Sequence, residues 1–253
     1  MNWRLIGQKA YSAAMNMAID HAIYESVANG REAPTIRFYK WMPSSISLGA
    51  YQNPKEINME AYKKHNIGIV RRMTGGRAVF HDKDDFTYSV IAPIRVFNYS
   101  IENAYRQICS WIINSLSELG IKASLENKND IMVDGKKISG NAAKAMDKGV
   151  YLQHGTLVYG IDFEVMPEVL GISSDIVKEK VTSVLKHKKI SQDEVYEALK
   201  NNFTEDKDIK TEELSKYEEI RADDLAKTKY NTIMLPSGTL LKNKGACYVE
   251  RSG

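Results

Sequence analysis

Residues 69–82, IVRRMTGGRAVFHD, combine paired glycines with arginines. Gly75 and Gly76 let a backbone approach a ligand closely or adopt a positive φ, and successive amide N–H groups in such a turn can bind an anion. Arg71 and Arg77 add planar donors that fit phosphate or carboxylate groups. The spacing matches neither a P-loop nor a dinucleotide-binding fingerprint. The stretch therefore predicts either an anion-binding loop or a plain hairpin turn with solvated arginines.

A second stretch, residues 129–142 with the sequence NDIMVDGKKISGNA, places two lysines after a tight turn. The dipeptide Asp134-Gly135 favours a hairpin, so Lys136 and Lys137 begin the returning strand and point to opposite faces. If Ile138 belongs to the core, Lys137 points away from it. Spacing alone does not decide which face lines a cleft, and two exposed lysines beside a turn are the simple alternative.

Three further polar residues could serve either chemistry or structure. Asp130 could bind a metal ion or only shape a turn, and His81 could orient a strand end or a ligand. His154 lies in an expected strand, where a lone histidine is usually structural. The residues alone favour the structural interpretation for all three.

The elements that must position these residues follow from hydrophobic periodicity and from Pro, Gly and Asn breaks. Helices are expected over residues 12–29, 100–119, 191–203 and, in a charged form, 211–229. Strands are expected over residues 35–39, 45–48, 67–70, 86–91, 130–133, 136–139 and 150–159, with a possible β-tail over 232–253. Short, hairpin-linked strands interleaved with helices predict an α+β fold with a mixed β-sheet flanked by helices.

Composition narrows the class of protein. The chain has 253 residues, 43% of them hydrophobic and 26% charged, which is ordinary for a globular protein of one large domain or two small ones. A net charge of +3 is too balanced to indicate nucleic-acid binding. Cys109 and Cys247 are the only cysteines, so we expect a reducing cytoplasm. No apolar run approaches the roughly 18 residues of a membrane span, and no secretory signal is evident.

Taken in order, several motifs resemble the lipoate–protein ligase and octanoyltransferase superfamily, and lipoate–protein ligase A in particular. They lie at residues 16–19, 71–76 with 81–82, 129–131, 135–140 and 154–157. The likeness covers roughly residues 3 to 205 and implies a mixed sheet flanked by helices, related to biotin–protein ligases. It predicts a catalytic domain over residues 1–205. Residues 206–253 would then be a charged helical segment and a tail rather than a full accessory domain.

The resemblance also implies roles for individual residues. Lys137 would be catalytic and would contact both the acyl carbonyl and the phosphate, while Asp130 would lie near the nucleotide and Mg²⁺ as a metal ligand. The residues expected to bind ATP and the lipoyl-adenylate are Arg71, Gly75, Gly76, Arg77, Ala78, Val79, His81, Asn129, Asp130, Lys137, Asn141 and His154.

The activity that this resemblance favours is an ATP-dependent lipoate–protein ligase. It would activate lipoate with ATP and Mg²⁺ and pass the lipoyl group to a lysine of a 2-oxoacid dehydrogenase E2 lipoyl domain or of the glycine-cleavage H protein. Only about 50 residues follow Phe203, too few for the accessory domain of full-length ligases. We therefore expect a separate small accessory protein to support activation.

Two other functions compete with the ligase. An octanoyl or lipoyl transferase would take the acyl group from an acyl carrier protein, and Gly75-Gly76-Arg77 resembles that branch because many ligases have a third glycine. Such a transferase needs a cysteine nucleophile. Cys109 falls on the apolar stripe of a helix and Cys247 in the tail, and residues 129–131 look like the ligase version, so we favour the ligase. The third and most remote alternative is a non-enzymatic module that binds nucleotide or nucleic acid. The nearly equal numbers of acidic and basic residues disfavour it.

Overall fold

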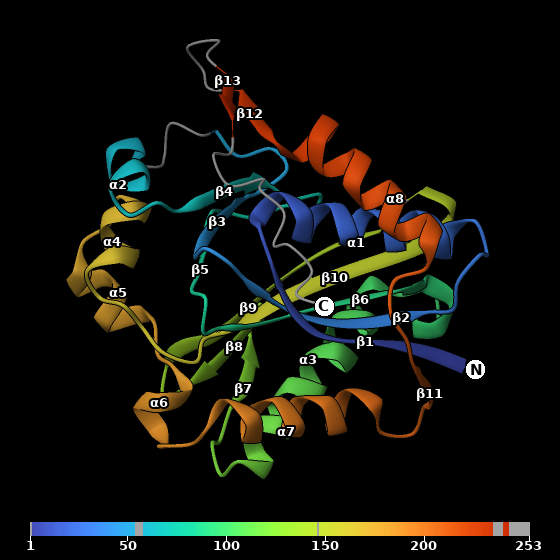
Figure 1. The fold of residues 1–253 in the computed structure, drawn as a ribbon. Coiled ribbons are helices and arrows are strands. Elements are labelled where there is room, and N and C mark those ends of the chain that lie inside the picture. Colours follow the sequence, from blue (N-terminus) through green and yellow to red (C-terminus); the bar gives the residue numbers. More distant parts are fainter. Residues whose placement is uncertain (1, 54–57, 146, 235–239, 243–253) are drawn as a thin grey trace.

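A large mixed β-sheet organises the molecule, for which the computed structural model describes residues 2–53, 58–145, 147–234 and 240–242 (Figure 1). Its eight strands lie in the order β11-β1-β2-β6-β10-β9-β8-β7. Strand β1 pairs in parallel with β2 and β11, whereas the remaining pairs are antiparallel. The strands are β1 (Asn2–Tyr11), β2 (Thr35–Trp41), β6 (Phe86–Pro93), β7 (Ser124–Glu126), β8 (Asp130–Val133), β9 (Lys136–Ala145), β10 (Val150–Leu157) and β11 (Asp208–Thr211). The predicted α+β fold with a mixed sheet is confirmed.

A smaller sheet carries the glycine-rich stretch. It contains β3 (Ser45–Leu48), β4 (Gly68–Arg71) and β5 (Val79–His81) in the order β4-β3-β5. The glycines lie in the loop between β4 and β5. Two short strands, β12 (Thr232–Met234) and β13 (Leu240–Lys242), pair at the end of the described chain. The rest of the expected β-tail, residues 235–239 and 243–253, lies outside the described residues.

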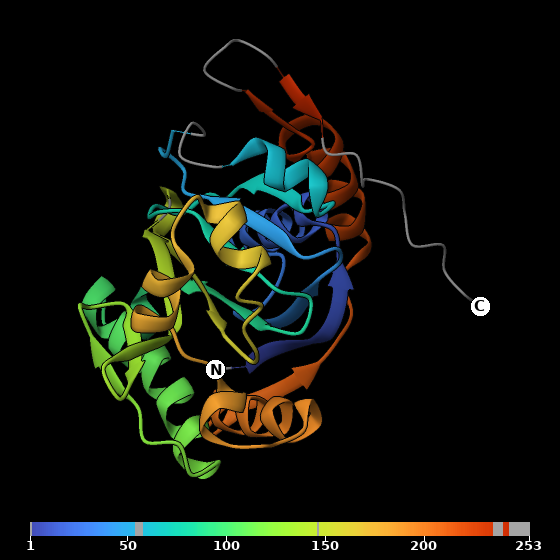
Figure 2. The same cartoon turned by 90° about the vertical axis from the view of Figure 1, so that its left-hand side faces the viewer.

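Helices cover both faces of the large sheet (Figures 1 and 2). Helices α3 and α7 pack on one face with the larger apolar cluster, and α1 and α8 pack on the other. Short helices α4 to α6 run between β10 and α7. The helices are α1 (Ala13–Ala28), α2 (Met59–Lys64), α3 (Ile101–Glu118), α4 (Val165–Leu170), α5 (Ser174–Lys180), α6 (Val184–His187), α7 (Gln192–Thr204) and α8 (Lys216–Leu225), with a π-helical turn over Ala226–Tyr230.

The long helices begin where the sequence provides a side-chain cap. The hydroxyls of Ser12 and Ser100 accept the N–H groups of Met15 and Asn103, and Ser191 forms a reciprocal capping box with Glu194. The three helices expected from residues 12, 100 and 191 are therefore confirmed to within one residue at their starts.

The region after residue 205 is where local patterns misled us most. The helix expected over 211–229 begins only at Lys216, because residues 208–211 form strand β11 beside β1. Strand β1 itself was not predicted. Helix α8 is fastened to β1 by a buried ion pair in which the guanidinium of Arg4 lies 2.6 Å from the carboxylate of Glu218. The described part of the charged segment therefore packs on the same sheet as the rest of the chain.

In the part of the chain that the structure describes, we found no helix with the length and apolar character needed to cross a membrane.

Candidate functional site

A cavity of about 320 Å³ lies where the small sheet faces strands β9 and β10 of the large one. Its volume is in the range of small-molecule sites. Apolar and aromatic side chains form part of its wall, and cationic and amide side chains form the rest. The lining residues are Met17, Tyr39, Trp41, Ser47, Arg72, Gly75, Gly76, Arg77, Ala78, Val79, His81, Thr87, Tyr105, Asn129, Lys137, Gly140, Asn141, Ala142, Ala143, His154, Gly155 and Thr156.

The glycine loop, residues 74–78, is held by the side chain of Arg72. The Arg72 guanidinium donates to the carbonyl oxygens of Gly75 and Arg77 at 2.6 and 2.8 Å, and to that of Ser47 at 2.7 Å. Gly76 has a φ of +95°, a conformation that favours glycine. Burial lowers the pKa of Arg72 to about 10, so the side chain remains charged at neutral pH. The loop is thus braced from inside by Arg72 and forms a wall of the cavity, while Gly76 and Arg77 remain exposed.

Arg71, which the resemblance assigned to the ATP site, is bound to the main chain beside its strand. It is not among the residues that line the cavity, and its Nη1 donates to the carbonyl oxygens of Gly49 and Gln52, both at 2.8 Å. Neighbouring residues at the end of a strand point to opposite sides, so only one of the two adjacent arginines can face inward. That residue is Arg72, which the sequence analysis did not single out.

Lys137 reaches the cavity from the hairpin of β8 and β9. Ile138 is fully buried in the core and lies at an irregularity in the register, so Lys137 turns outward as expected. Its Nζ lies 2.6 Å from Oδ1 of Asp130, and 41% of its side chain is exposed. A Cβ on Gly140 would come within 2.8 Å of this Nζ, so the glycine leaves room for the lysine to cross the strand.

Segment α5–α6 supports the same hairpin from outside. The N–H of Thr182 donates to the carbonyl oxygen of Lys137 at 2.9 Å, and Nζ of Lys136 donates to the carbonyl of Lys178 at 2.7 Å. The backbone of Lys137 is therefore fixed, whereas its side chain is partly exposed and is held by Asp130 alone among the salt bridges of the described residues.

Two asparagines join the lysine hairpin to the central sheet. Asn129 and Asn141 exchange side-chain to main-chain hydrogen bonds of 2.8 and 3.0 Å. The hydroxyl of Tyr88 donates to Oδ1 of Asn141 at 2.5 Å. Both asparagines line the cavity, but these bonds already occupy much of their hydrogen-bonding capacity.

The two predicted site histidines form the inner wall. His81 stacks on Trp41 with ring centroids 4.1 Å apart and makes hydrogen bonds to Ser47 and Thr156. His154 makes a 2.6 Å hydrogen bond to the hydroxyl of Thr74. Burial lowers the pKa of both histidines, so both are neutral near pH 7.

Sequence reasoning missed the aromatic and apolar part of the cavity. Trp41, Tyr39 and Thr87 come from central strands, and Met17 comes from α1. In a central strand covered on both faces, apolar residues occur on both sides, so no alternation marks those that line a cavity. Met17 lies in the motif at residues 16–19, which was the one available signal.

The side chains around Asp130 do not favour a metal site there. Its carboxylate is already paired with Lys137, and it does not line the cavity. Within residues 2–53, 58–145, 147–234 and 240–242, no group of three His, Cys, Asp or Glu side chains is placed to hold a metal ion. We therefore derive no reaction step through Mg²⁺.

The geometry suits a reaction in which an acyl carbonyl gains negative charge. Lys137 lines a cavity with both apolar and polar side chains in its wall, and the braced glycine loop lines the same cavity. A cation positioned in such a place stabilises an oxyanion more strongly than it would in water.

Comparison with known proteins agrees with this chemistry. Residues 12–204 match the family described as the lipoyl protein ligase A/B catalytic domain. Octanoyltransferase LipM of Halalkalibacterium halodurans is 35% identical, over 91% of this chain and 96% of the relative. LipM of Bacillus subtilis is 34% identical, over 90% and 95%.

Two solved structures share the fold. A lipoate-protein ligase A bound with ATP has a TM-score of 0.81 and 31% identity, over 90% of this chain and 96% of that one. A bi-partite lipoate protein ligase of Thermoplasma acidophilum, described with its E2 lipoyl domain, has a TM-score of 0.79 and 30% identity, over 90% and 93%.

These relatives correct our functional prediction. The sequence analysis favoured an ATP-dependent lipoate ligase, but the curated relatives are octanoyltransferases, so the ligase prediction is wrong and its alternative is better supported. The two motifs had pointed in opposite directions: Gly75-Gly76-Arg77 resembled the transferase branch and residues 129–131 the ligase, and the sequence analysis gave more weight to the second. The chain belongs to the lipoyl protein ligase A/B catalytic domain family of lipoate ligases and octanoyltransferases.

Proposed function

We propose that this chain transfers a medium-chain acyl group, octanoyl above all, from a carrier-protein thioester to a lysine side chain of a lipoyl domain. The observation that carries the proposal is that Lys137 and the braced glycine loop line one cavity, together with apolar side chains such as Met17 and Trp41. The names of the curated relatives support octanoyl as the group transferred.

The sequence analysis required a cysteine nucleophile for a transferase, but Cys109 does not line the cavity, so we propose direct transfer between the two protein substrates without an acyl-cysteine intermediate. The neutral amine of the acceptor lysine attacks the thioester carbonyl, a C–N bond forms and the C–S bond breaks. The thiolate leaves and takes up the proton that the amine loses. Lys137 stabilises the negative charge on the carbonyl oxygen in the tetrahedral intermediate, an effect worth about 10²–10³-fold in rate for one such donor.

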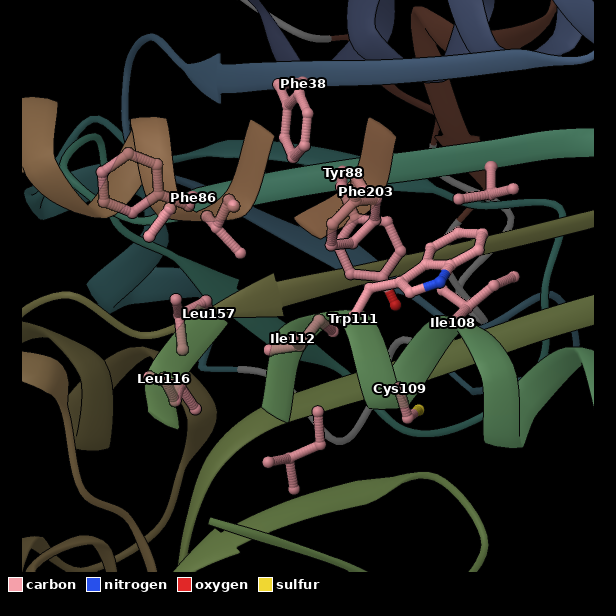
Figure 3. Packing of buried hydrophobic residues seen from close by; sticks show 14 of the residues in the cluster. Phe38, Phe86, Tyr88, Ile108, Cys109, Trp111, Ile112, Leu116, Leu157 and Phe203 are labelled. Carbon is pink, nitrogen blue, oxygen red and sulfur yellow. The ribbon is translucent and has the colours of Figure 1, made fainter. Parts of the chain in front are cut away.

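Cys109 has no part in this proposal as an acyl carrier. Its side chain is fully buried among Trp111, Ile112 and other residues of the core between α3 and the sheet, and it does not line the cavity (Figure 3). Burial raises the pKa of its thiol to about 12, so almost no thiolate exists at neutral pH. Cys109 lies in the core, where its position on the apolar stripe of the helix predicted it.

We propose that the other predicted site residues bind the acyl donor and not a nucleotide. Gly75, Gly76, Arg77, Ala78, Val79, Asn141 and His154 would contact the thioester group and the first carbons of the chain. Use of ATP and the need for an accessory protein were tied to activation of free lipoate, so neither belongs to this proposal. The acceptor is the lipoyl domain of an E2 subunit or the glycine-cleavage H protein.

A mass measurement on the acceptor tests the function. The chain is incubated with octanoyl carrier-protein thioester and an apo lipoyl domain, without ATP, and we expect the mass increase of one octanoyl group on the lysine. Modification that requires free octanoate or lipoate together with ATP would overturn the proposal.

Cysteine variants test the route of transfer. Cys109→Ser should keep its activity, because the thiol lies outside the cavity. Cys247 lies outside the described residues, so its place relative to the cavity is tested by experiment. The single variant Cys247→Ser and the double variant that replaces both cysteines by serine are measured beside Cys109→Ser. An octanoylated cysteine trapped at Cys109 would contradict the direct route.

A further inference from the structure

A line of buried polar groups runs from helix α1 to the glycine loop. Asp20 on α1, His154 on β10 and Thr74 at the start of the loop are each less than 8% exposed. Nε2 of His154 lies 2.6 Å from the hydroxyl oxygen of Thr74, and its Nδ1 lies 3.6 Å from Oδ2 of Asp20. The second distance is an electrostatic contact, longer than a hydrogen bond. Of the three residues, His154 lines the cavity.

The contacts at Thr74 and at Asp20 favour the same tautomer of His154. Nε of Arg72 can only donate, and it donates to the Thr74 hydroxyl at 3.2 Å. If the hydroxyl in turn donates to Nε2 of His154, the imidazole carries its proton on Nδ1, facing the carboxylate of Asp20. The opposite tautomer would turn the Nδ1 lone pair toward that carboxylate. It would also leave the Thr74 proton without an acceptor among the hydrogen bonds of the described residues.

The carboxylate of Asp20 is held firmly enough to serve as the anchor. Oδ1 accepts from Nη1 of Arg37 at 2.7 Å and from the hydroxyl of Ser89 at 2.9 Å, while Oδ2 accepts from the hydroxyl of Tyr39 at 3.1 Å. Burial alone would raise the pKa of Asp20, but Arg37 and His154 outweigh it and the pKa is lowered. A buried carboxylate that stays ionised keeps its negative charge directed at Nδ1 of His154.

We propose that Asp20 is a positioning residue for acyl transfer, which orients His154 and, through Thr74, fixes the glycine loop against the cavity. The inference rests on the proposed function as far as the reaction is concerned. Asp20 itself touches no substrate. Its effect passes through a histidine whose ring orientation and tautomer it sets, in the way that a carboxylate orients a histidine in other enzymes.

The tautomer is measured directly, without any assay of activity. Long-range ¹H–¹⁵N spectra of protein labelled at histidine should show His154 with its proton on Nδ1 at pH 7. Asp20→Asn removes the negative charge that faces Nδ1, so the population of this tautomer should fall measurably although the Thr74 hydrogen bond remains. The matched control is Ser89→Ala, which removes a hydrogen bond to the Asp20 oxygen that faces away from His154, and it should keep the wild-type signal. A wild-type proton on Nε2, or an unchanged tautomer in Asp20→Asn, would overturn the proposal.

Variants at Thr74 test the link to the loop and leave the Asp20–Arg37 pair intact, should Asp20→Asn fail to fold. Thr74→Val keeps the shape but removes the hydroxyl, and we expect the transfer rate to fall roughly 10²-fold, the size of effect caused by small misplacements at a reacting centre. Thr74→Ser restores the hydroxyl and should restore most of the rate. Equal activity of the two folded variants would contradict the link.

The two measurements separate this inference from the proposed function. If wild-type protein shows no transfer from the thioester, the proposed function fails, while the spectra still decide whether Asp20 sets the tautomer of His154. If transfer occurs and Asp20→Asn transfers at the wild-type rate with an unchanged tautomer, the function stands and the positioning role falls.

Discussion

The two walls of the cavity are built differently. On the wall of β4, β5 and the glycine loop, Arg72, Thr74 and His81 are almost fully buried, and hydrogen bonds connect each of them to its neighbours. On the lysine hairpin, 41% of the Lys137 side chain is exposed, and its partner in the structure is Asp130. One wall presents a fixed main chain, and the other presents a cation on a flexible stem.

This difference indicates a division of labour. A preorganised loop costs little reorganisation when the substrate binds, because its conformation is set before binding. A half-exposed lysine can exchange Asp130 for a carbonyl oxygen as negative charge develops there. We therefore expect changes on the hairpin to lower the rate with little loss of stability, and changes on the loop wall to lower both.

The largest effect is expected at Lys137. Lys137→Ala removes the cation and should lower the transfer rate about 10²–10³-fold, while the melting temperature stays close to wild type. The control is Lys136→Ala, whose side chain bonds to the carbonyl of Lys178 outside the cavity. Initial rates and thermal melts of both variants provide the measurement. Small, equal losses in the two variants would show that the hairpin wall does not take part in the reaction.

Adjacent arginines provide the sharpest test of the loop wall. Arg72→Lys loses the fork that holds Ser47, Gly75 and Arg77, and each buried carbonyl left without a donor costs about 1–3 kcal/mol in the free energy of unfolding. Arg71→Lys should cost less, because that side chain is partly exposed and lies outside the cavity.

Urea unfolding and transfer rates of the Arg72→Lys and Arg71→Lys variants show whether Arg72 alone holds the loop or whether both arginines do. Should Arg71→Lys prove the more damaging in both measurements, the loop would be held from the other side of β4.

The sequence was informative where one local signal suffices. Ser12, Ser100 and Ser191 mark helix starts because the cap is made within four residues, and Asp134-Gly135 marks the lysine hairpin. The contents of the glycine loop could also be named, because Gly75 to Val79 are contiguous and all line the cavity.

What the sequence could not show depends on contacts between distant segments. Strands β1 and β11 pair although about 200 residues separate them in the sequence, and no local pattern in either strand predicts the pairing. The choice between Arg71 and Arg72 depends on which side of β4 faces the large sheet. The contact of Asp20 with His154 likewise joins a helix to a strand 134 residues later, so the polar line beneath the loop had no signature in the sequence.

A glycine on the hairpin offers a milder perturbation of Lys137. In Gly140→Ala the new methyl group would lie 2.7 Å from Cε of Lys137, so the flexible end of the lysine must move. We expect a loss of roughly 10-fold in rate, less than when the cation is removed altogether. Gly7→Ala in β1 is a control, because its Cβ would make only an ordinary 3.8 Å contact with Tyr196. An unchanged rate in Gly140→Ala would mean that Lys137 acts from another rotamer.

Lowering the pH should destabilise the loop wall before it destabilises the lysine hairpin. We expect this to be the smallest of the predicted effects. Burial lowers the pKa of His81 well below 6.5, whereas the same side chain in the unfolded state titrates near 6.5. Below that pH the unfolded state binds more protons, so the free energy of unfolding falls as the pH drops from 7 toward 5.

Hydrogen exchange locates that acid effect within the molecule. Protection factors of residues 72–81 should fall over this range of pH more than those of residues 130–140, because the latter hairpin carries no histidine. In His81→Asn part of the pH dependence should disappear. Equal losses of protection on both walls would show instead that the cavity opens as one unit, and the contrast between a fixed wall and a responsive one would then not hold.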